Sequence, residues 1–453
     1  MSQYGAGPLL SAVWSPFSLA QYGGMDWAYP FFYARKQSDE VGLRLIANAS
    51  LFAYLSVLAV WLGFLLFAVS SNWLANYASI TEGELAFYVM GILPTSLIYW
   101  LCYLLRFLGR ADSFVKITLL GRILPVIVVL PLLPWVEQEN RLLVSFAVGW
   151  VLSCLALCYA LYEIRRVGHW PFQLSLFDLK LSKEMMRYGL LLVPAGAAYA
   201  LMVVTDRLLI GYFLGTEAVA VHAVALSIGS LGLMMVAWFG LAFDPYLSRW
   251  VASGDQTNYL PKIQLLASSL PVFFVLLSCL AAVWSAPIVR FLYPEGYGPA
   301  ALLIPLIIYS AALTVLSRLG VAAAIIAQSP KYHSLLYTCA LFINVVVGWW
   351  LLPELGVLGA VVSTVVAEAV ILAGWIYLGR FRLKNLPIRW KSAGLILLLG
   401  LGFIVASIQQ LNEDHSWKML LLMSAGLVGA SLLLLYLAVG SDGLSRLYKY
   451  LRV

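Results

Sequence analysis

Long apolar segments, each close to the thickness of a lipid bilayer, recur along almost the whole of this chain. A helix needs roughly 20 apolar residues to cross the hydrocarbon layer. Hydrophobic residues make up 62% of the 453 residues and charged residues only 11%, which is more apolar surface than a soluble core can bury. The runs are too long and continuous for the alternating strands of a membrane barrel. The sequence therefore predicts an all-α, polytopic helical membrane protein.

About thirteen segments reach this length when they are bounded at charged residues, Pro or Gly. In chain order they are Leu9–Tyr33, Leu45–Ser70, Leu85–Leu108, Val115–Val136, Leu142–Tyr162, Leu190–Leu214, Val219–Phe243, Ile263–Leu292, Ala300–Ala324, Leu335–Leu352, Gly356–Leu378, Ala393–Ile408 and Met419–Val439. The first contains Pro16 and Asp26 among many small and polar residues, so we expect it to face protein or water rather than lipid.

Lys and Arg gather in alternate connections between these segments, a pattern typical of cytoplasmic loops. Basic groups follow the first segment at Arg35 and Lys36 and return at Lys331 and in the loop 380–391. Of the intervening connections, 71–84, 215–218 and 353–355 contain no Lys or Arg, and 409–418 contains one. We therefore expect a multi-pass protein with a cytoplasmic C-terminus and an N-terminus outside.

The predicted topology divides the chain into two lobes and a tail. We expect an N-terminal lobe of five helices over 1–164, a cytoplasmic linker over 165–187 with an interfacial helix near Leu174–Met186, a C-terminal lobe of six helices over 188–380, and two trailing helices with a short tail over 381–453. The external N-terminus suggests that the chain begins one helix late. With one more helix upstream, the chain would have two pseudo-symmetric six-helix lobes. The alternatives are that thirteen helices are native or that the first segment is re-entrant.

Several classes of function have no support in the sequence. The net charge of +7 is spread over small basic groups rather than one stripe, so we expect no nucleic-acid partner. The five Cys residues lie inside apolar segments without metal-ligand spacing. No Walker, HExxH or GxSxG motif occurs, so we expect neither an enzyme nor a bound cofactor or metal.

Several stretches carry a family resemblance that covers essentially the whole chain. They are Gln3–Gly5, Gly23–Asp26, Tyr33–Lys36, Met186–Pro194, Thr205–Gly215, Ala286–Tyr297 and Gly356–Ala360. With these stretches the chain resembles the polysaccharide-transporter branch of the multidrug/oligosaccharidyl-lipid/polysaccharide (MOP) exporter superfamily, which includes O-antigen flippases. The motifs indicate the superfamily better than the substrate.

The resemblance implies a flippase that moves an isoprenoid-pyrophosphate-linked oligosaccharide across the bacterial inner membrane, by alternating access of two lobes, for lipopolysaccharide or other surface polysaccharide biosynthesis. Its partners would be membrane lipids, this lipid-linked sugar and other polysaccharide assembly proteins. The alternative from the same superfamily is a multidrug exporter coupled to H⁺ or Na⁺. A membrane glycan polymerase would need a large external loop that the sequence lacks, and an inactive truncated remnant is a further alternative.

Ionisable residues inside membrane spans are costly, so each is a functional candidate. Arg207, Arg122 and Arg318 are the predicted substrate-binding residues, because a guanidinium group can hold phosphate oxygens with two hydrogen bonds. The predicted coupling or cavity residues are Asp26, Asp206, Asp244 and Glu368. The alternatives are snorkelling for Arg122 and Arg318, a structural ion pair for Asp206, and a protonated carboxyl bonded to a neighbouring helix for Glu368. For Asp26 and Asp244 the alternative is a bond to the backbone at a helix end.

Overall fold

The computed structural model of the protein describes residues 24–36, 40–70, 82–137, 140–167, 175, 177–253, 256–326, 330–382, 390–410 and 417–451. Regular structure in these ranges is helical throughout, without a strand. Nine continuous helical segments in these ranges are long and apolar enough to cross a membrane, and two shorter apolar helices cover Arg44–Val60 and Ala393–Ala406. The predicted all-helical polytopic fold is therefore confirmed. Most of the predicted first span lies outside the described residues, so the total of thirteen spans stays a prediction.

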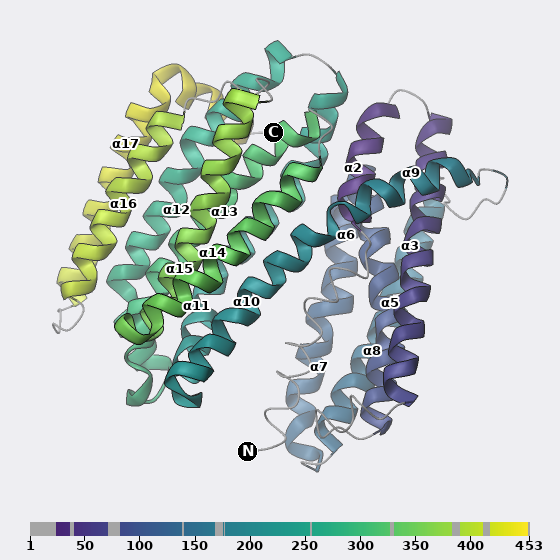
Figure 1. The fold of residues 1–453 in the computed structure, drawn as a ribbon, viewed down its shortest axis with the longest axis horizontal. Coiled ribbons are helices and arrows are strands. Elements are labelled where there is room, and N and C mark those ends of the chain that lie inside the picture. The colour runs from purple at the N-terminus through teal and green to yellow at the C-terminus, as the bar shows by residue number, and fades with distance from the viewer. Residues whose placement is uncertain are drawn as a thin grey trace. The chain divides into compact units, whose positions relative to one another are not determined.

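The chain splits into two compact units, Met1–Ala197 and Ala198–Val453 (Figure 1). The helices that lie wholly in unit 1 are α2 (Met25–Lys36), α3 (Glu40–Ser70), α5 (Glu82–Phe107), α6 (Ala111–Thr118), the π-helix η1 (Leu119–Ile123), α7 (Leu124–Leu132), the short 3₁₀ helix η2 (Leu133–Trp135), α8 (Arg141–Arg166) and α9 (Leu179–Leu190). Helix α10 (Val193–Leu214) begins in unit 1 and continues into unit 2. The remaining elements are α11 (Thr216–Ser253), α12 (Gln256–Leu292), η5 (Glu295–Tyr297), α13 (Ala300–Ile326), α14 (Lys331–Leu355), α15 (Val357–Tyr377), the π-helix η6 (Leu378–Arg382), α16 (Trp390–Gln410) and α17 (Trp417–Leu451).

The core of unit 1 forms where α2, α3, α5 and α8 pack together, with Tyr54, Leu105 and Ile164 almost fully buried. The predicted span Val115–Val136 is one helical segment made of α6, η1, α7 and η2. Its middle turn widens into a π-helix, an irregularity that is uncommon and frequent at functional sites.

Helix α9 corresponds to the predicted interfacial helix but begins and ends four to five residues later. It begins at Leu179 because the Asp178 side chain accepts a hydrogen bond from the Leu181 N–H (3.0 Å) and caps the helix N-terminus. Its buried face packs on α2 and α3, where Tyr188 stacks on Phe31 with 4.3 Å between the ring centroids. A Cβ atom at Gly24 would collide with the Gly189 backbone, so α9 and the start of α2 approach as closely as two backbones can. The linker helix is thus part of unit 1.

Unit 2 is built around α13, which packs against α11, α12 and α15. In the most apolar stretch of α13, 94% of the residues are buried, whereas in that of α17 only 6% are. Both stretches have a mean hydropathy of 2.2. Equal hydropathy with opposite burial means that α13 meets protein on all sides and that α17 offers its apolar surface to lipid. The trailing helices α16 and α17 pack on α12.

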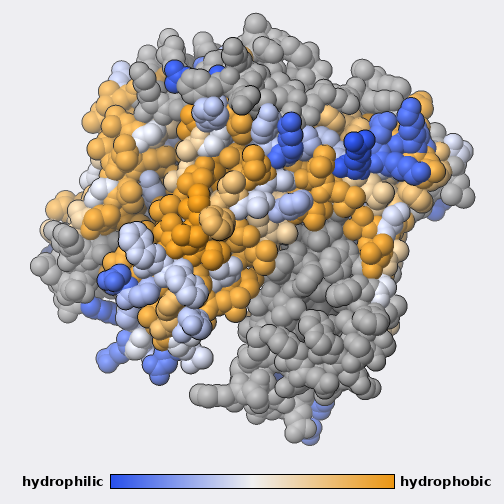
Figure 2. Space-filling view, viewed as in Figure 1, coloured by the Kyte–Doolittle hydropathy of each residue, from blue (hydrophilic) through white to orange (hydrophobic). Residues whose placement is uncertain are grey.

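Apolar side chains also cover most of the described surface on the face drawn in Figure 2, where hydrophilic residues gather in a few small groups. Large exposed apolar residues occur on many helices, including Leu208 on α10, Phe342 on α14 and Leu398 on α16. Such an extensive apolar exterior suits a protein that is solvated by lipid chains.

Candidate functional site

A buried cluster of polar side chains joins three helices of unit 2. Asp206 of α10 accepts a hydrogen bond from the Thr364 hydroxyl of α15 (2.6 Å) and another from the Asn344 amide of α14 (3.2 Å). The same amide lies 3.2 Å from the Ser363 hydroxyl oxygen. Asp206 is 7% exposed and Asn344 is fully buried. We call Asp206, Asn344, Ser363 and Thr364 the Asp206 cluster.

Small residues allow the three helices to come this close. A Cβ atom at Gly348, one turn beyond Asn344, would lie 3.2 Å from Leu209 Cδ1 and 3.3 Å from Ser363 Oγ. A Cβ atom at Gly359 would collide with the backbone of Leu351. Because α14 has glycine where it faces α10 and α15, and α15 has glycine where it faces α14, the polar groups of the cluster come within hydrogen-bonding reach.

The Asp206 cluster opens into a cavity of about 80 Å³ within unit 2. The residues that line it are Tyr199, Met202, Asp206, His222, Leu226, Leu233, Ile307, Ser310, Val361, Thr364 and Glu368. The cavity has room for an ion with a few water molecules, whereas pockets for drug-sized ligands measure about 300–1,000 Å³. The described lining residues include two carboxyl groups and no Arg or Lys, so the chemistry of the cavity suits a small cation.

Glu368 is the second carboxyl group in the cavity, one helical turn from Thr364 on α15. Its side chain is 3% exposed and lies beside Thr314 of α13, while Oε2 has no hydrogen-bond partner among the described residues. A buried polar atom without a partner is uncommon in folded proteins, and such atoms are often contacted by a water molecule or a bound ion. Carboxylate and hydroxyl oxygens are the ligands that small hard cations prefer.

The predicted site residues fall into separate groups. Asp206 and Glu368 share the cavity, and the half-buried Arg207 adjoins it on α10, its Nε atom without a hydrogen-bond partner in the described structure. Arg318 instead pairs with Asp244 of α11, at 3.8 Å from Nη1 to Oδ2. The roles assigned to these five residues stay predictions.

Two further predicted site residues have side chains outside the described part of the structure. The backbone of Asp26 belongs to α2 and that of Arg122 to η1. Their assigned roles likewise stay predictions.

Sequence reasoning missed Asn344, Thr364 and His222. Asn344 and Thr364 have uncharged side chains, and His222 is a single His in an apolar segment. Asn344 is the one amide inside the span Leu335–Leu352, and that isolation was the available signal. The hydroxyl groups of Ser and Thr gave none, because they also bond to their own helix backbone, as Thr364 does to the Ala360 carbonyl.

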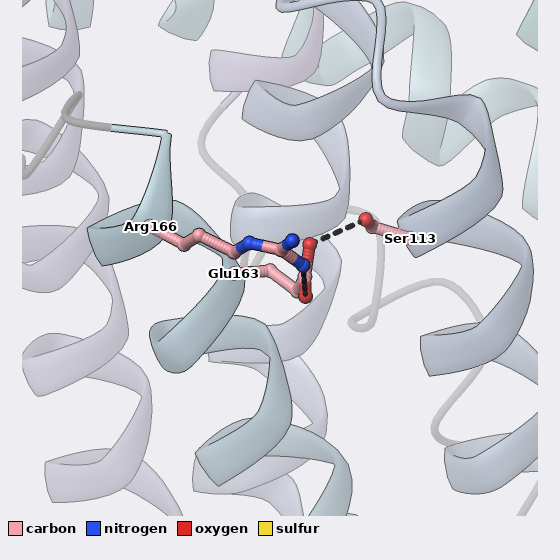
Figure 3. A network of polar contacts seen from close by, with 3 residues as sticks. All are labelled: Ser113, Glu163 and Arg166. Carbon is pink, nitrogen blue, oxygen red and sulfur yellow. Dashed lines mark hydrogen bonds and ion pairs between the residues drawn. The ribbon is translucent and has the colours of Figure 1, made fainter.

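Unit 1 contains its own polar network where α6 begins and α8 ends (Figure 3). The Ser113 hydroxyl donates to Glu163 Oε2 (2.8 Å), and Arg166 Nη1 lies 3.7 Å from Glu163 Oε1. Glu163 is 5% exposed and the Arg166 side chain is 67% exposed, so the buried tie between the two helix ends is the Ser113–Glu163 hydrogen bond.

These observations define a class: a polytopic helical membrane protein with a helical bundle in each of two units and a buried, carboxylate-lined cavity in the second. Its fold is that of the MATE transporters. The chain is similar to the crystal structure of a MATE protein in the straight conformation, with a TM-score of 0.71 and 16% identity over 85% of this chain and 89% of that one.

Two further solved structures have the same fold. A MATE protein in the bent conformation gives a TM-score of 0.67 at 18% identity, over 85% of this chain and 87% of that one. A mutant of a Vibrio cholerae MATE transporter gives 0.67 at 12% identity, over 84% and 89%. No protein-family model matches the sequence, and no curated protein matches it as a sequence relative. MATE transporters belong to the MOP exporter superfamily, which is the superfamily that the sequence resembles.

Proposed function

We propose that this protein is a non-enzymatic, cation-coupled transporter that moves a lipid-linked oligosaccharide outward across the bacterial inner membrane. The single observation that carries the coupling is the cavity of unit 2, where Asp206 and Glu368 line a small space and no Arg or Lys is among the described lining residues. The shared fold of the MATE transporters supports transport. The sequence resemblance to the polysaccharide branch supports the cargo.

In this proposal the cation and the cargo use different places. The cavity of about 80 Å³ is far too small for a saccharide, so it binds only H⁺ or Na⁺. The cargo, an isoprenoid-pyrophosphate oligosaccharide, is held by arginine, with Arg207 as the first candidate. Binding the cation favours one arrangement of the helices around Asp206, and that preference is what couples the ion gradient to alternating access.

A cation-coupled exporter of cationic small molecules is the second candidate. The structural neighbours favour it at least as strongly, because they are MATE transporters. The carboxylate-rich cavity is compatible with it, since an excess of carboxylate over arginine suits a cationic cargo as well as a cationic coupling ion.

Proteoliposomes distinguish the two candidates. Purified protein is reconstituted with a short-chain isoprenyl-pyrophosphate glycan in one preparation and a fluorescent cationic dye in another, and translocation is followed under a Na⁺ or H⁺ gradient. Gradient-driven movement of the glycan lipid that is lost in Asp206→Asn supports the proposal. Movement of the dye alone favours the exporter, and movement of neither overturns both. In cells, deletion should remove surface polysaccharide and leave inward-facing lipid-linked sugar behind.

A further inference from the structure

A stripe of polar side chains continues from the cavity along α13. Ser310, Thr314 and Arg318 follow one another at intervals of four residues, so they lie on one face of the helix. Ser310 lines the cavity, and the Thr314 hydroxyl, which donates to the Ser310 carbonyl (2.9 Å), lies beside Glu368. Arg318 comes one turn later. The stripe therefore leads away from the cavity towards the end of α13 that precedes Lys331.

Polar and aromatic residues of the neighbouring helices accompany this stripe. On α14, Tyr337 and His333 lie two and three turns before Asn344, and their rings are 4.6 Å apart. Tyr337 also packs edge-on to Tyr199 of α10, at 6.2 Å, and His333 lies 5.8 Å from Trp375 of α15. All but Tyr199 are at least nine-tenths buried. Together with the α13 stripe and Glu368, these residues form what we call the polar column.

The column ends at an ion pair. Arg318 and Asp244 have side chains that are 31% and 28% exposed, whereas Glu368 is 3% exposed, so the pair marks the point where the column reaches the surface of unit 2. The Arg318 guanidinium lies directly against Gly240, one turn before Asp244 on α11, and a Cβ atom there would collide with it. Gly240 leaves space for the Arg318 guanidinium and Asp244 pairs with it, so together they fix the positive charge at the end of the column.

Packing alone does not require these side chains. Each polar group placed inside a membrane protein costs free energy that an apolar side chain of similar size would avoid. Continuous lines of such groups are how membrane proteins move ions and protons, and a fixed Arg is an effective electrostatic barrier to cations.

We propose that the polar column is the route by which the coupling cation passes between the Asp206 cavity and the end of unit 2 at Lys331, and that Arg318, held over Gly240 by Asp244, closes it. The proposal rests on the proposed function in one respect: the cavity is taken to bind that cation. It gives Arg318 a gating role that differs from the predicted contact with the cargo.

Cysteine accessibility tests the route without any cargo. In a variant whose five native Cys residues are replaced, Thr314→Cys is treated with a small cationic methanethiosulfonate reagent, applied in inside-out vesicles. We expect slow reaction with Arg318 present and a rate at least about tenfold higher in Arg318→Ala, because one unit charge a helical turn away is removed from the path of a cation. Gly240→Ala should raise the rate too, since it displaces the flexible end of Arg318 without removing the charge.

Two controls separate gating from general loosening. Val315→Cys, fully buried on another face of α13, should stay unreactive in every background. Gly211→Ala, where a Cβ atom would make an ordinary 3.6 Å contact with Val219, should leave the Thr314→Cys rate unchanged. A Thr314→Cys rate that neither Arg318→Ala nor Gly240→Ala raises, or an equal gain at Val315→Cys, overturns the route. If Asp206-dependent transport persists in that case, only the route fails. If the rates behave as expected but no gradient drives transport, only the proposed function fails.

Discussion

The hydrogen bond from Thr364 to Asp206 gives a sharp test of the cluster. Thr364→Val keeps the side-chain shape but removes the hydroxyl that donates to Asp206 at 2.6 Å. Asp206 is 7% exposed, and the valine side chain offers no donor in place of the hydroxyl. A hydrogen bond to a charged group contributes about 1.5–3 kcal/mol. For a domain of 150–250 residues each kcal/mol shifts the Tm by roughly 2–4 °C, so the variant should melt about 3–12 °C lower in Na⁺-free buffer.

The matched control is Thr118→Val in unit 1. The Thr118 hydroxyl bonds only to the Phe114 carbonyl of its own helix (2.9 Å), which the helix already satisfies, so its loss should change the Tm by no more than about 1 °C. A double-mutant cycle with Asp206→Asn sharpens the test, because the Thr364→Val penalty should shrink when the acceptor is neutral. Equal melting temperatures for Thr364→Val and Thr118→Val in detergent-solubilised protein would refute the reasoning.

Three further predictions concern packing, the unit 1 network and the cargo. Gly320→Ala on α13 should destabilise unit 2 by about 1–3 kcal/mol in thermal melts, since the new methyl meets the immobile stem of Trp375, while Gly402→Ala, which meets nothing within 4 Å, should not. Ser113→Ala should lower the stability of unit 1 by about 1.5–3 kcal/mol and expose the α6–α8 ends to protease, and Ser145→Ala, whose hydroxyl bonds only to its own helix, should do neither. Arg207→Ala should slow glycan-lipid transport at least about tenfold. Arg207→Lys should recover part of this rate, because Lys keeps the charge but lacks the two-pronged donor. Full transport by Arg207→Ala would remove the assignment of Arg207 to the cargo.

The existence of the described long helices could be predicted from the sequence, and two of them match closely. The predicted span Leu142–Tyr162 lies inside α8, and Ala300–Ala324 lies inside α13. Both depend only on a long apolar run between polar ends, which is a local property of the chain. The start of α9 differs from the predicted start because it depends on a single capping residue, Asp178, which a count of apolar periodicity does not include.

The candidate site could be predicted only in part. Asp206 and Glu368 stand out in the sequence because a carboxyl group in an apolar run is costly. Their common cavity, and the pairing of Arg318 with Asp244, depend on how each helix is rotated about its axis, which hydropathy does not specify. The neutral members of the cluster, above all Asn344 and Thr364, carry no cost large enough to mark them.

The sequence by itself determined that this protein is a helical membrane protein, because the bilayer imposes its thickness and its lack of hydrogen-bonding partners on every segment separately. Only the tertiary structure decided which polar groups meet. Asp206 reaches Asn344 across 138 positions and Thr364 across 158, and it does so because Gly348 and Gly359 let their helices approach closely. Contacts between residues so distant in the chain are set by close packing between helices, and no local pattern of residues encodes them.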